Sequence, residues 1–467
     1  MRALILGAAL AAMSSQSAQA QIRPDQESFR ALYKELVETN TTLSAGSCTL
    51  AAERLAMRMK AAGFTDTDLT LFSIPEKPKE GGLVAVYPGT SKKAKPILLL
   101  GHIDVVEANR ADWTRDPFTL IEENGFFYAR GTSDDKAQSA IWADSLIRYK
   151  LEGFKPKRTI KMALTCGEET TNAFNGADWL AQNRKDLIDA EYALNEGGGG
   201  RVGSDGKRQI LAMQVGEKTV QNFMLEATNP GGHSSMPRPD NAIYSLSGAV
   251  SRVGKHEFPV QFNDTTRSFF TRLVPTVPAA AGNAIIALLA NPNDDAANAI
   301  VSVDPVLHST LRTTCVATML EAGHAMNALP QRARAVVNCR MFPGTKVEDV
   351  QAALAGAIND PLVKITTIPP VRPLASAPPF SAKIFGPAEK LAAEMFPGIP
   401  MLPTQSTGAT DAIFLAPISI PTYGVPGIFY EADGGGIHGL NEKMRVKSLY
   451  DGRDYLFRLV KSYANQE

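Results

Sequence analysis

The stretch Gly101–Val105 (GHIDV) follows Pro96–Leu100 (PILLL), a short apolar run that predicts a buried strand. Its histidine emerges at the carboxyl end of that strand, and its aspartate stands two residues later. Ligands bind at this edge in open α/β sheets. A neutral imidazole there can bind a transition metal, and a nearby carboxylate can hold the ring in the required tautomer. A lone His-X-Asp is more often a surface or hydrogen-bonded pair than a metal site. Whether His102 is a metal ligand therefore depends on motifs elsewhere in the chain.

Length and charge set broad limits on the protein. The chain has 467 residues and a formal net charge of zero. This length predicts two domains. The balanced charge, and the absence of a basic run interleaved with aromatic residues, argue against a nucleic-acid partner.

The amino terminus resembles an export signal. Arg2 precedes the apolar segment 4–13, which is too short to span a bilayer comfortably, and small residues stand at Ala18 and Ala20. We therefore expect a signal peptide over residues 1–20, cleaved after Ala20, and an exported, periplasmic or secreted protein without a membrane span. The alternative is a poorly ordered apolar start of a cytosolic protein.

The chain has four scattered cysteines, Cys48, Cys166, Cys315 and Cys339. Their spacing argues against a cysteine-based zinc site. In an exported protein some of them could pair, and the sequence leaves the pairing open. Because Cys166 and Cys339 lie in apolar, strand-like surroundings, we expect buried free thiols.

Hydrophobic periodicity predicts a doubly wound α/β domain in the first half of the chain. Helices are expected over residues 26–39, 49–62 and 137–151, and strands over 69–74, 83–87, 96–100, 159–165 and 192–196. From about residue 216 the pattern becomes α+β. Strands are expected over 220–228, 314–320, 332–340 and 363–368, helices over 241–253 and 347–358, and irregular structure over 259–306. The α/β pattern resumes after about residue 371, which predicts a catalytic domain over 21–215 and 371–467 with a lid domain over 216–370 inserted into it.

Ligand-type side chains follow several of the expected strands. They are His102, Asp134, Glu168, Glu169, Glu196 and, far along the chain, His438. Two imidazoles with several carboxylates suit Zn²⁺ or a similar divalent ion. So many carboxylates fit two ions bridged by one of them, a pair that polarises a carbonyl and lowers the pKa of a bridging water. The alternative is that each acid caps a helix.

Six motifs resemble the signatures of the M20 metallopeptidase family. They are Gly101–Val105 (GHIDV), Gly131–Lys136 (GTSDDK), Gly167–Glu169 (GEE), Gly232–Ser234 (GHS), Arg340–Gly344 (RMFPG) and His438–Glu442 (HGLNE). The family includes zinc carboxypeptidases, dipeptidases, aminoacylases and succinyl-diaminopimelate desuccinylases. The resemblance covers nearly the whole chain after the signal and implies an α/β catalytic domain with a mixed central sheet flanked by helices, plus a smaller α+β lid.

The resemblance also implies two Zn²⁺ per chain, with Co²⁺ or Mn²⁺ as alternatives. The implied ligands are His102, Asp134, Glu169, Glu196 and His438. Each histidine would bind one ion, and Asp134 would bridge both. Glu168 would be the general base on the bridging water, since its neighbour Glu169 is a ligand. Asp104 would lie behind His102, and the Asp134–Asp135 peptide bond would be cis.

Three lid residues have implied roles toward the substrate. His233 would polarise the scissile carbonyl, Arg340 would hold the substrate carboxylate, and Asn327 would assist Arg340. The alternatives are a solvent-facing loop histidine and a structural ion pair of Arg340.

The sequence departs from the family pattern at Ala137 and Ala409, where glycine is usual, and in a longer lid. The longer lid leaves open whether the chain forms the lid-to-lid homodimer of the family.

These observations predict a metal-dependent hydrolase of an amide bond next to a free carboxylate, namely a carboxypeptidase or dipeptidase acting on small peptides. An N-acyl-amino-acid hydrolase is the alternative on the same site. A non-catalytic binding protein would be expected to lack a ligand or the base, and all of these are present.

Overall fold

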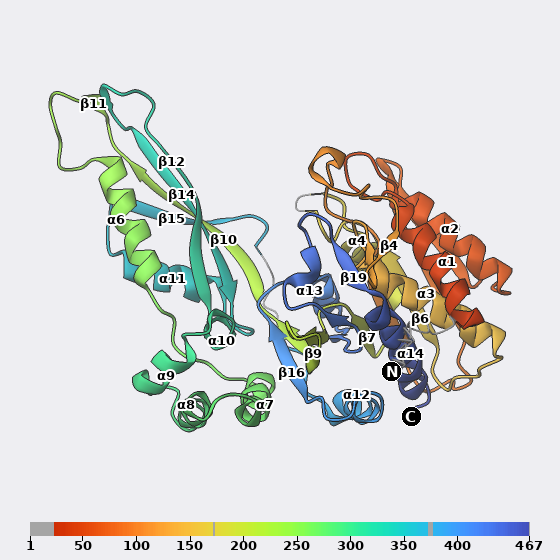
Figure 1. The fold of residues 1–467 in the computed structure, drawn as a ribbon. Helices are drawn as coiled ribbons and strands as arrows, with labels where there is room; N and C mark the ends of the chain where they lie inside the picture. Colours follow the sequence, from red (N-terminus) through yellow and green to blue (C-terminus); the bar gives the residue numbers. More distant parts are fainter. Residues whose placement is uncertain (1–22, 171–172, 372–376, 467) are drawn as a thin grey trace, which may run out of the picture.

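The computed structural model describes residues 23–170, 173–371 and 377–466. The expected signal peptide over residues 1–20 lies outside them. Among the helices in these ranges, none combines the length and the apolar character that crossing a membrane requires. Figure 1 shows two bodies, a larger one built on a central sheet and an elongated one built on a second sheet.

The central sheet is mixed and contains ten strands of the described residues. In spatial order they are β1 (Leu69–Ile74), β2 (Lys77–Tyr87), β6 (Ile160–Thr165), β3 (Ile97–His102), β7 (Tyr192–Asn195), β17 (Thr422–Gly424), β9 (Arg208–Glu217), β8 (Gly199–Val202) and β18 (Phe429–Tyr430), with β16 (Met401–Ser406) beside β9. Strands β6, β3 and β7 are parallel neighbours. Their carboxyl ends therefore meet at one edge of the sheet.

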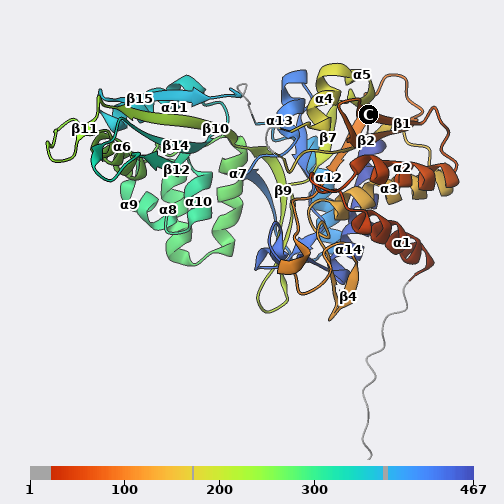
Figure 2. The same cartoon turned by 90° about the horizontal axis from the view of Figure 1, so that it is seen from above.

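Helices cover both faces of this sheet, as Figure 2 shows. On β3, Ile97 and Leu99 pack into the core of one face, and Leu98 and Leu100 pack into the core of the other. Burial on both faces explains why this strand is apolar at every position. The first face is covered by α1 (Pro24–Glu38), α2 (Cys48–Ala61), α3 (Lys136–Leu151), α12 (Ala382–Met395) and α14 (Val446–Ala464), and the second by α4 (Gly176–Asn183), α5 (Lys185–Ile188) and α13 (Ala412–Leu415).

The second body is a four-stranded antiparallel sheet with helices on one face. Its strands, in spatial order, are β12 (Thr314–Ala322), β14 (Arg332–Met341), β10 (Thr219–Thr228) and β15 (Val363–Ile368), and its helices are α6 (Ala242–Lys255) and α11 (Val347–Ile358). Burial alternates along β10 and β14 because only the helix side of the sheet contributes to the core. The expected α/β fold with an inserted α+β lid is confirmed.

Short elements complete the two bodies. They are the lid-tip strands β11 (Gly232–His233) and β13 (Ala328–Leu329), the small sheet of β4 (Ile121–Glu123), β5 (Phe126–Tyr128) and β19 (Lys443–Arg445), and the 3₁₀ turns η1 (Arg110–Asp112), η3 (Ala416–Ile418) and η4 (Gly434–Gly436).

The segment 259–306 is helical, so the expectation of irregular structure there is wrong. It contains α7 (Asp264–Leu273), η2 (Val274–Thr276), α8 (Ala279–Ala290) and α9 (Asp295–Val301), and α10 (Pro305–Thr310) follows. Pro275 lies in the first turn of η2 and Pro278 precedes α8, positions where a missing N–H costs nothing. The prediction took these prolines as helix breakers, but they stand where helices begin.

This helical insertion also contacts the catalytic body. Phe270 and Leu273 of α7 share an apolar core with Leu402 of β16. The side-chain amide of Asn263 donates to Oε1 of Gln405 at 2.7 Å. The lid is thus attached to the central sheet by packing, in addition to the chain crossings that follow β9 and β15.

All four cysteines form disulfides, Cys48–Cys166 and Cys315–Cys339. The expectation of free thiols at Cys166 and Cys339 is therefore wrong. Apolar surroundings suit a thiol and a disulfide equally, so they could not distinguish the two. Cys315 and Cys339 stand directly opposite each other on β12 and β14, a pairing that only the register of the sheet reveals.

Candidate metal centre

The ends of three parallel strands supply most of the candidate ligands. His102 is the last residue of β3, Glu196 directly follows β7, and Glu168 and Glu169 follow β6 after Gly167. Gly167 has φ 99°, and a Cβ there would lie 1.9 Å from the carbonyl oxygen of Phe174. Only glycine therefore allows the turn that brings the two glutamates to this edge.

Two other loops complete the set. Asp134 lies in the turn before α3, and the Asp134–Asp135 peptide bond is cis, as expected. His438 lies between η4 and β19. Two groups of three side chains have ligand atoms within 4.8 Å of one another: His102, Asp134 and Glu196, and then Asp134, Glu169 and His438.

Asp134 belongs to both groups and already lies between the two imidazoles. Its Oδ1 is 3.1 Å from Nε2 of His102, and its Oδ2 is 3.1 Å from Nε2 of His438. Glu169 Oε2 is 2.9 Å from the same nitrogen of His438, and Glu196 Oε2 is 3.8 Å from that of His102. The donor set, imidazole nitrogen and carboxylate oxygen in two triads with one shared member, fits a pair of zinc-like ions.

Electrostatics support the same reading. Burial disfavours a charge on His102, but the carboxylates of Glu196, Asp104 and Asp134 outweigh it and raise the histidine pKa. Hydrogen bonds to Asp134 and Glu169 raise the pKa of His438 to about 10. Both shifts reflect the negative charge of the carboxylates that crowd around the two imidazoles. A divalent cation would neutralise this charge.

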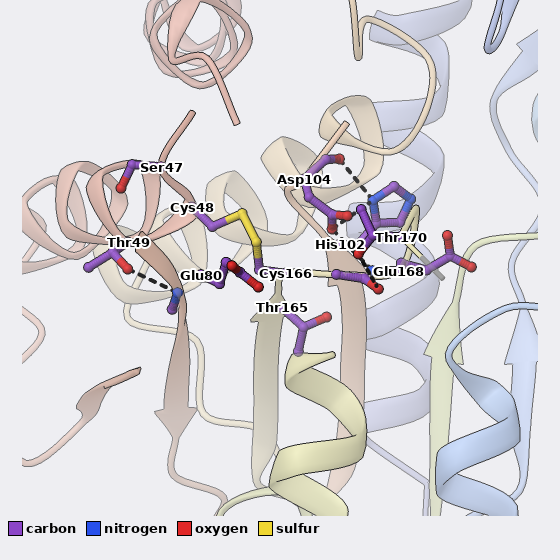
Figure 3. Close-up of a disulfide and its surroundings, with 12 residues drawn as sticks. Ser47, Cys48, Thr49, Glu80, His102, Asp104, Thr165, Cys166, Glu168 and Thr170 are labelled. Carbon is purple, nitrogen blue, oxygen red and sulfur yellow. Dashed lines mark hydrogen bonds and ion pairs between the residues drawn. A yellow bond between two sulfur atoms is a disulfide. The ribbon is translucent and has the colours of Figure 1, made fainter. Parts of the chain in front are cut away.

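Glu168 lies beside the triads without belonging to either. Burial raises its pKa to about 10; neighbouring Glu196, Asp411 and Glu169 add to the shift, and His102 opposes it. Such a carboxyl has a strong tendency to hold a proton in the metal-free site. Figure 3 shows Glu168 beside His102, and its backbone N–H donates to the carboxylate of Asp104.

Asp104 touches both His102 and the glutamate loop. His102 Nδ1 lies 3.1 Å from the carbonyl oxygen of Asp104 and 3.6 Å from its carboxylate Oδ1. The same carboxylate accepts the backbone N–H groups of Glu168 (3.3 Å) and Glu169 (3.1 Å). Asp104 therefore lies behind His102, as expected, and also fixes the loop that carries two site glutamates.

The Cys48–Cys166 disulfide lies on the other side of this loop (Figure 3). It joins the first residue of α2 to the residue before Gly167. The main chain that leads to Glu168 is thus held covalently on one side and by the carboxylate of Asp104 on the other.

Comparison with known proteins gives the geometry a context. The model of Peptidase family M20/M25/M40 matches residues 98–462, most of the chain. The chain belongs to the M20 peptidase family. As a member, it is an enzyme of the M20 metallopeptidase type.

Relatives of this M20 enzyme carry two kinds of name. It is 28% identical over 389 residues to the "Probable carboxypeptidase S-like 2" of Dictyostelium discoideum, covering 81% of this chain and 74% of the relative. It is 27% identical over 387 residues to the human "N-fatty-acyl-amino acid synthase/hydrolase PM20D1", covering 80% and 75%. The fold matches that of the M20 family metallo-carboxypeptidase Sso-CP2 of Sulfolobus solfataricus, with a TM-score of 0.68, 18% identity, and coverage of 93% and 99%.

Two lid residues of this M20 enzyme lie away from the candidate metal ligands. His233 and Asn327 are exposed at the tip of the lid, where the N–H of Ser234 donates to the carbonyl of Asn327. Arg340 lies at the opposite end of β14, eight residues beyond Arg332. At about 3.3 Å per residue, these ends are roughly 26 Å apart. Within one chain, Asn327 and Arg340 are therefore far apart, so the expected assistance of Arg340 by Asn327 would require a second copy of the chain.

Arg340 lies on the sheet face that the lid helices leave uncovered. It is half-buried, and no hydrogen bond or ion pair of its guanidinium is found within the described ranges. Lys218, at the crossing from β9 to β10, is fully buried, and burial, with Arg340 nearby, lowers its pKa to about 7. A half-buried guanidinium that has no acidic partner among the described residues, beside the amino group of Lys218, favours an anion.

Asp411 is a site residue whose role sequence reasoning missed. It is buried, and it accepts hydrogen bonds from the amide of Asn175 at 2.7 Å and the hydroxyl of Thr165 at 3.2 Å. Burial raises its pKa to about 7. Its carboxyl is one of the acidic groups that raise the pKa of Glu168. The sequence contained one indication of this residue: Asp411 is an acid that follows β16 (Met401–Ser406), in the loop that contains Ala409.

Proposed function

We propose that this enzyme is a co-catalytic metal hydrolase that cleaves an amide bond next to a free carboxylate. One observation carries the proposal: the two ligand triads share Asp134, whose two oxygens face two different imidazoles. The proposed ligands are His102, Asp134 and Glu196 for one ion, and Asp134, Glu169 and His438 for the other, with Zn²⁺ as the ion and Co²⁺ or Mn²⁺ as substitutes.

Bound ions would supply a Lewis acid that polarises the amide carbonyl and makes a water more acidic. Glu168 is the proposed general base. It takes a proton from the attacking water and passes it to the nitrogen of the leaving amine, so that one carboxyl serves both steps. Asp104 keeps Glu168 in place through the backbone N–H that its carboxylate accepts.

The proposed recognition element for the substrate is Arg340, which binds the free carboxylate from the lid, proposed to span residues 216–370. No acidic partner of Arg340 is found in the part of the chain that the structure describes, and this supports the role, because a half-buried guanidinium gains most from an incoming anion. Peptides and N-acyl amino acids both end in such a carboxylate. The first proposed activity is that of a carboxypeptidase or dipeptidase, and the relatives named N-fatty-acyl-amino acid hydrolases favour the second candidate, N-acyl-amino-acid hydrolysis.

A substrate panel with an Arg340 variant tests these activities. Zinc-loaded protein is assayed on dipeptides, longer peptides, N-acyl amino acids of increasing chain length and their carboxamides. Arg340→Met is expected to raise KM for the free acids by about 10- to 100-fold, the effect of one to two charge-assisted hydrogen bonds, with little change in kcat. Arg334→Met, on the same strand but paired with Glu226, is the control and should leave KM unchanged. Equal activity on acids and carboxamides would refute the role of Arg340, and no hydrolysis of any amide would refute the function.

A homodimer is the proposed route by which lid-tip residues reach a metal centre. Val316, Met319 and Leu320 are exposed on β12, an edge strand, and Tyr244 is exposed on α6. An apolar edge strand is a natural pairing surface for a second copy. Nδ1 of His233 accepts the N–H of Ser235 at 3.1 Å, which leaves its Nε2–H as a donor for a polarised carbonyl in the other copy.

Mixing two inactive variants tests this arrangement. Glu168→Gln and His233→Ala chains, unfolded and refolded together in equal amounts, should regain about a quarter of wild-type activity, because half of the dimers are mixed and each has one intact site. Each variant refolded alone is the control. A mixture no more active than its components would show that His233 does not act across subunits.

Export to an oxidising compartment is part of the proposal. It is supported by the pairing of all four cysteines, which is typical of secreted and periplasmic proteins.

A further inference from the structure

Glu442, the last residue of the motif His438–Glu442, is fully buried. Its carboxylate accepts four N–H groups. Oε2 accepts from the backbone of Gly131 at 2.9 Å and from Nη1 of Arg130 at 2.8 Å, and Oε1 accepts from the backbone of Ser133 at 2.7 Å and of Asp134 at 3.2 Å. One side chain thus organises the whole turn that presents Asp134.

Arg130 connects the same turn to the other end of the motif. Its Nη2 donates to the carbonyl of Gly439 at 2.8 Å while its Nη1 donates to Glu442. The guanidinium is almost fully buried and lies over the ring of Trp113, 5.0 Å from its centroid. Both the residue after His438 and the end of the motif are therefore tied to the turn before α3.

The two loops that this pair joins carry two members of one triad. Asp134 and His438 are more than 300 residues apart in sequence, and neither lies in a strand of the central sheet. Their side chains meet at 3.1 Å, and Glu169 completes the triad from the end of β6. Glu442 and Arg130, which are not candidate ligands themselves, therefore join the two loops directly beside the ligands, next to the strand pairing of β5 with β19.

We propose that Glu442, with Arg130, is a positioning residue that sets the spacing of Asp134 and His438 and thereby the affinity of the metal site formed by Asp134, Glu169 and His438. This inference rests on the metal centre of the proposed function. Glutamine is the informative replacement for Glu442: it has the same shape, but its NH₂ group would face N–H donors, whereas the carboxylate accepts on both oxygens.

A merely structural ion pair is the competing explanation, and the chain provides a matched control for it. Arg453 of α14 is fully buried and donates from Nε to Oδ2 of Asp144 at 2.8 Å. Asp144 lies on α3, two turns beyond its start, and belongs to neither triad. Asp144→Asn therefore weakens a buried ion pair of the same body without touching the loops of the metal centre.

The test is a titration of the metal-free, full-length protein with Zn²⁺, followed by calorimetry, with anomalous X-ray scattering to locate each ion. Wild type is expected to bind two ions. Glu442→Gln should bind the ion at Asp134, Glu169 and His438 about 10- to 100-fold more weakly, the usual effect of losing a partner behind the ligands. The Asp144→Asn affinities should equal those of wild type. At saturating Zn²⁺, kcat of Glu442→Gln should return close to wild type, because Glu442 touches no reacting atom.

Arg130→Lys is the second variant and keeps the inference testable if Glu442→Gln does not fold. It preserves the charge and the three backbone hydrogen bonds of Glu442 but cannot bond Glu442 and Gly439 together, so a smaller weakening at the same site is expected. Wild-type zinc affinity in the folded variants, or an equal loss in Asp144→Asn, would overturn the positioning role. Fewer than two ions on wild type would instead overturn the proposed metal centre.

Discussion

Replacing Glu168 with glutamine will lower kcat by about 10²- to 10⁴-fold, the usual contribution of a general acid–base group, while the zinc content remains that of wild type. Glu168 belongs to neither ligand triad, so its charge is not needed to hold an ion. Glutamine keeps its size and its backbone hydrogen bond to Asp104 but cannot accept the proton of the attacking water. KM should change little, because Arg340 still binds the substrate carboxylate.

Glu169→Gln is the matched control, since the two residues are neighbours on one loop. Its side chain lies 2.9 Å from His438 in the second triad, so this variant should lose zinc as well as rate. Zinc content and kcat are measured for both. If Glu168→Gln loses zinc and Glu169→Gln keeps it, the two roles are exchanged. Near-full activity of Glu168→Gln with normal zinc would refute the proposed proton transfer.

Asp134→Asn is expected to reduce bound zinc to one ion per chain or none and to lower activity by at least about 10⁴-fold, the upper end of the effect expected for Glu168. Asp134 is the one residue that the two triads share, and each of its oxygens faces a different imidazole. An asparagine has a single oxygen ligand and cannot serve both positions.

Metal analysis of purified protein and kcat at several zinc concentrations measure this effect. Excess Zn²⁺ should not restore the activity of Asp134→Asn, which distinguishes it from Glu442→Gln. Asp144→Asn again serves as the control for a general loss of stability. Two tightly bound ions in Asp134→Asn would show that Asp134 does not bridge them.

The strand-end residues of the candidate site could be predicted from the sequence, because the carboxyl ends of parallel strands meet at one edge of a sheet. The apolar run before His102 is short and fully buried, so strand, edge and emerging side chain followed from local sequence. Glu168, Glu169 and Glu196 likewise follow strands that local sequence predicts. The helix over residues 347–358 and the strands over 69–74 and 363–368 also have the predicted bounds. Because β6, β3 and β7 are neighbours in the sheet, these candidate ligands lie close together.

What could not be predicted depends on contacts between distant segments. The partner of Cys166 is Cys48, 118 residues away, and no local pattern encodes that pairing. The roles of Glu442 and Asp411 rest on hydrogen bonds to turns far away in sequence. The position of Asn327 depended on the length of β14, which separates the lid tip from Arg340 although both belong to one domain.

The helical insertion after α6 has a consequence for how substrates are admitted. A lid held only by two chain crossings can swing about the line that joins them, and substrate can draw it shut. Here Phe270 and Leu402 share a core beside that line, and Asn263 is bonded to Gln405. A large swing would expose this apolar surface to water, at about 25 cal/mol for each Å². The shared core therefore resists a large swing of the lid relative to the central sheet, and substrate has to enter without such a movement.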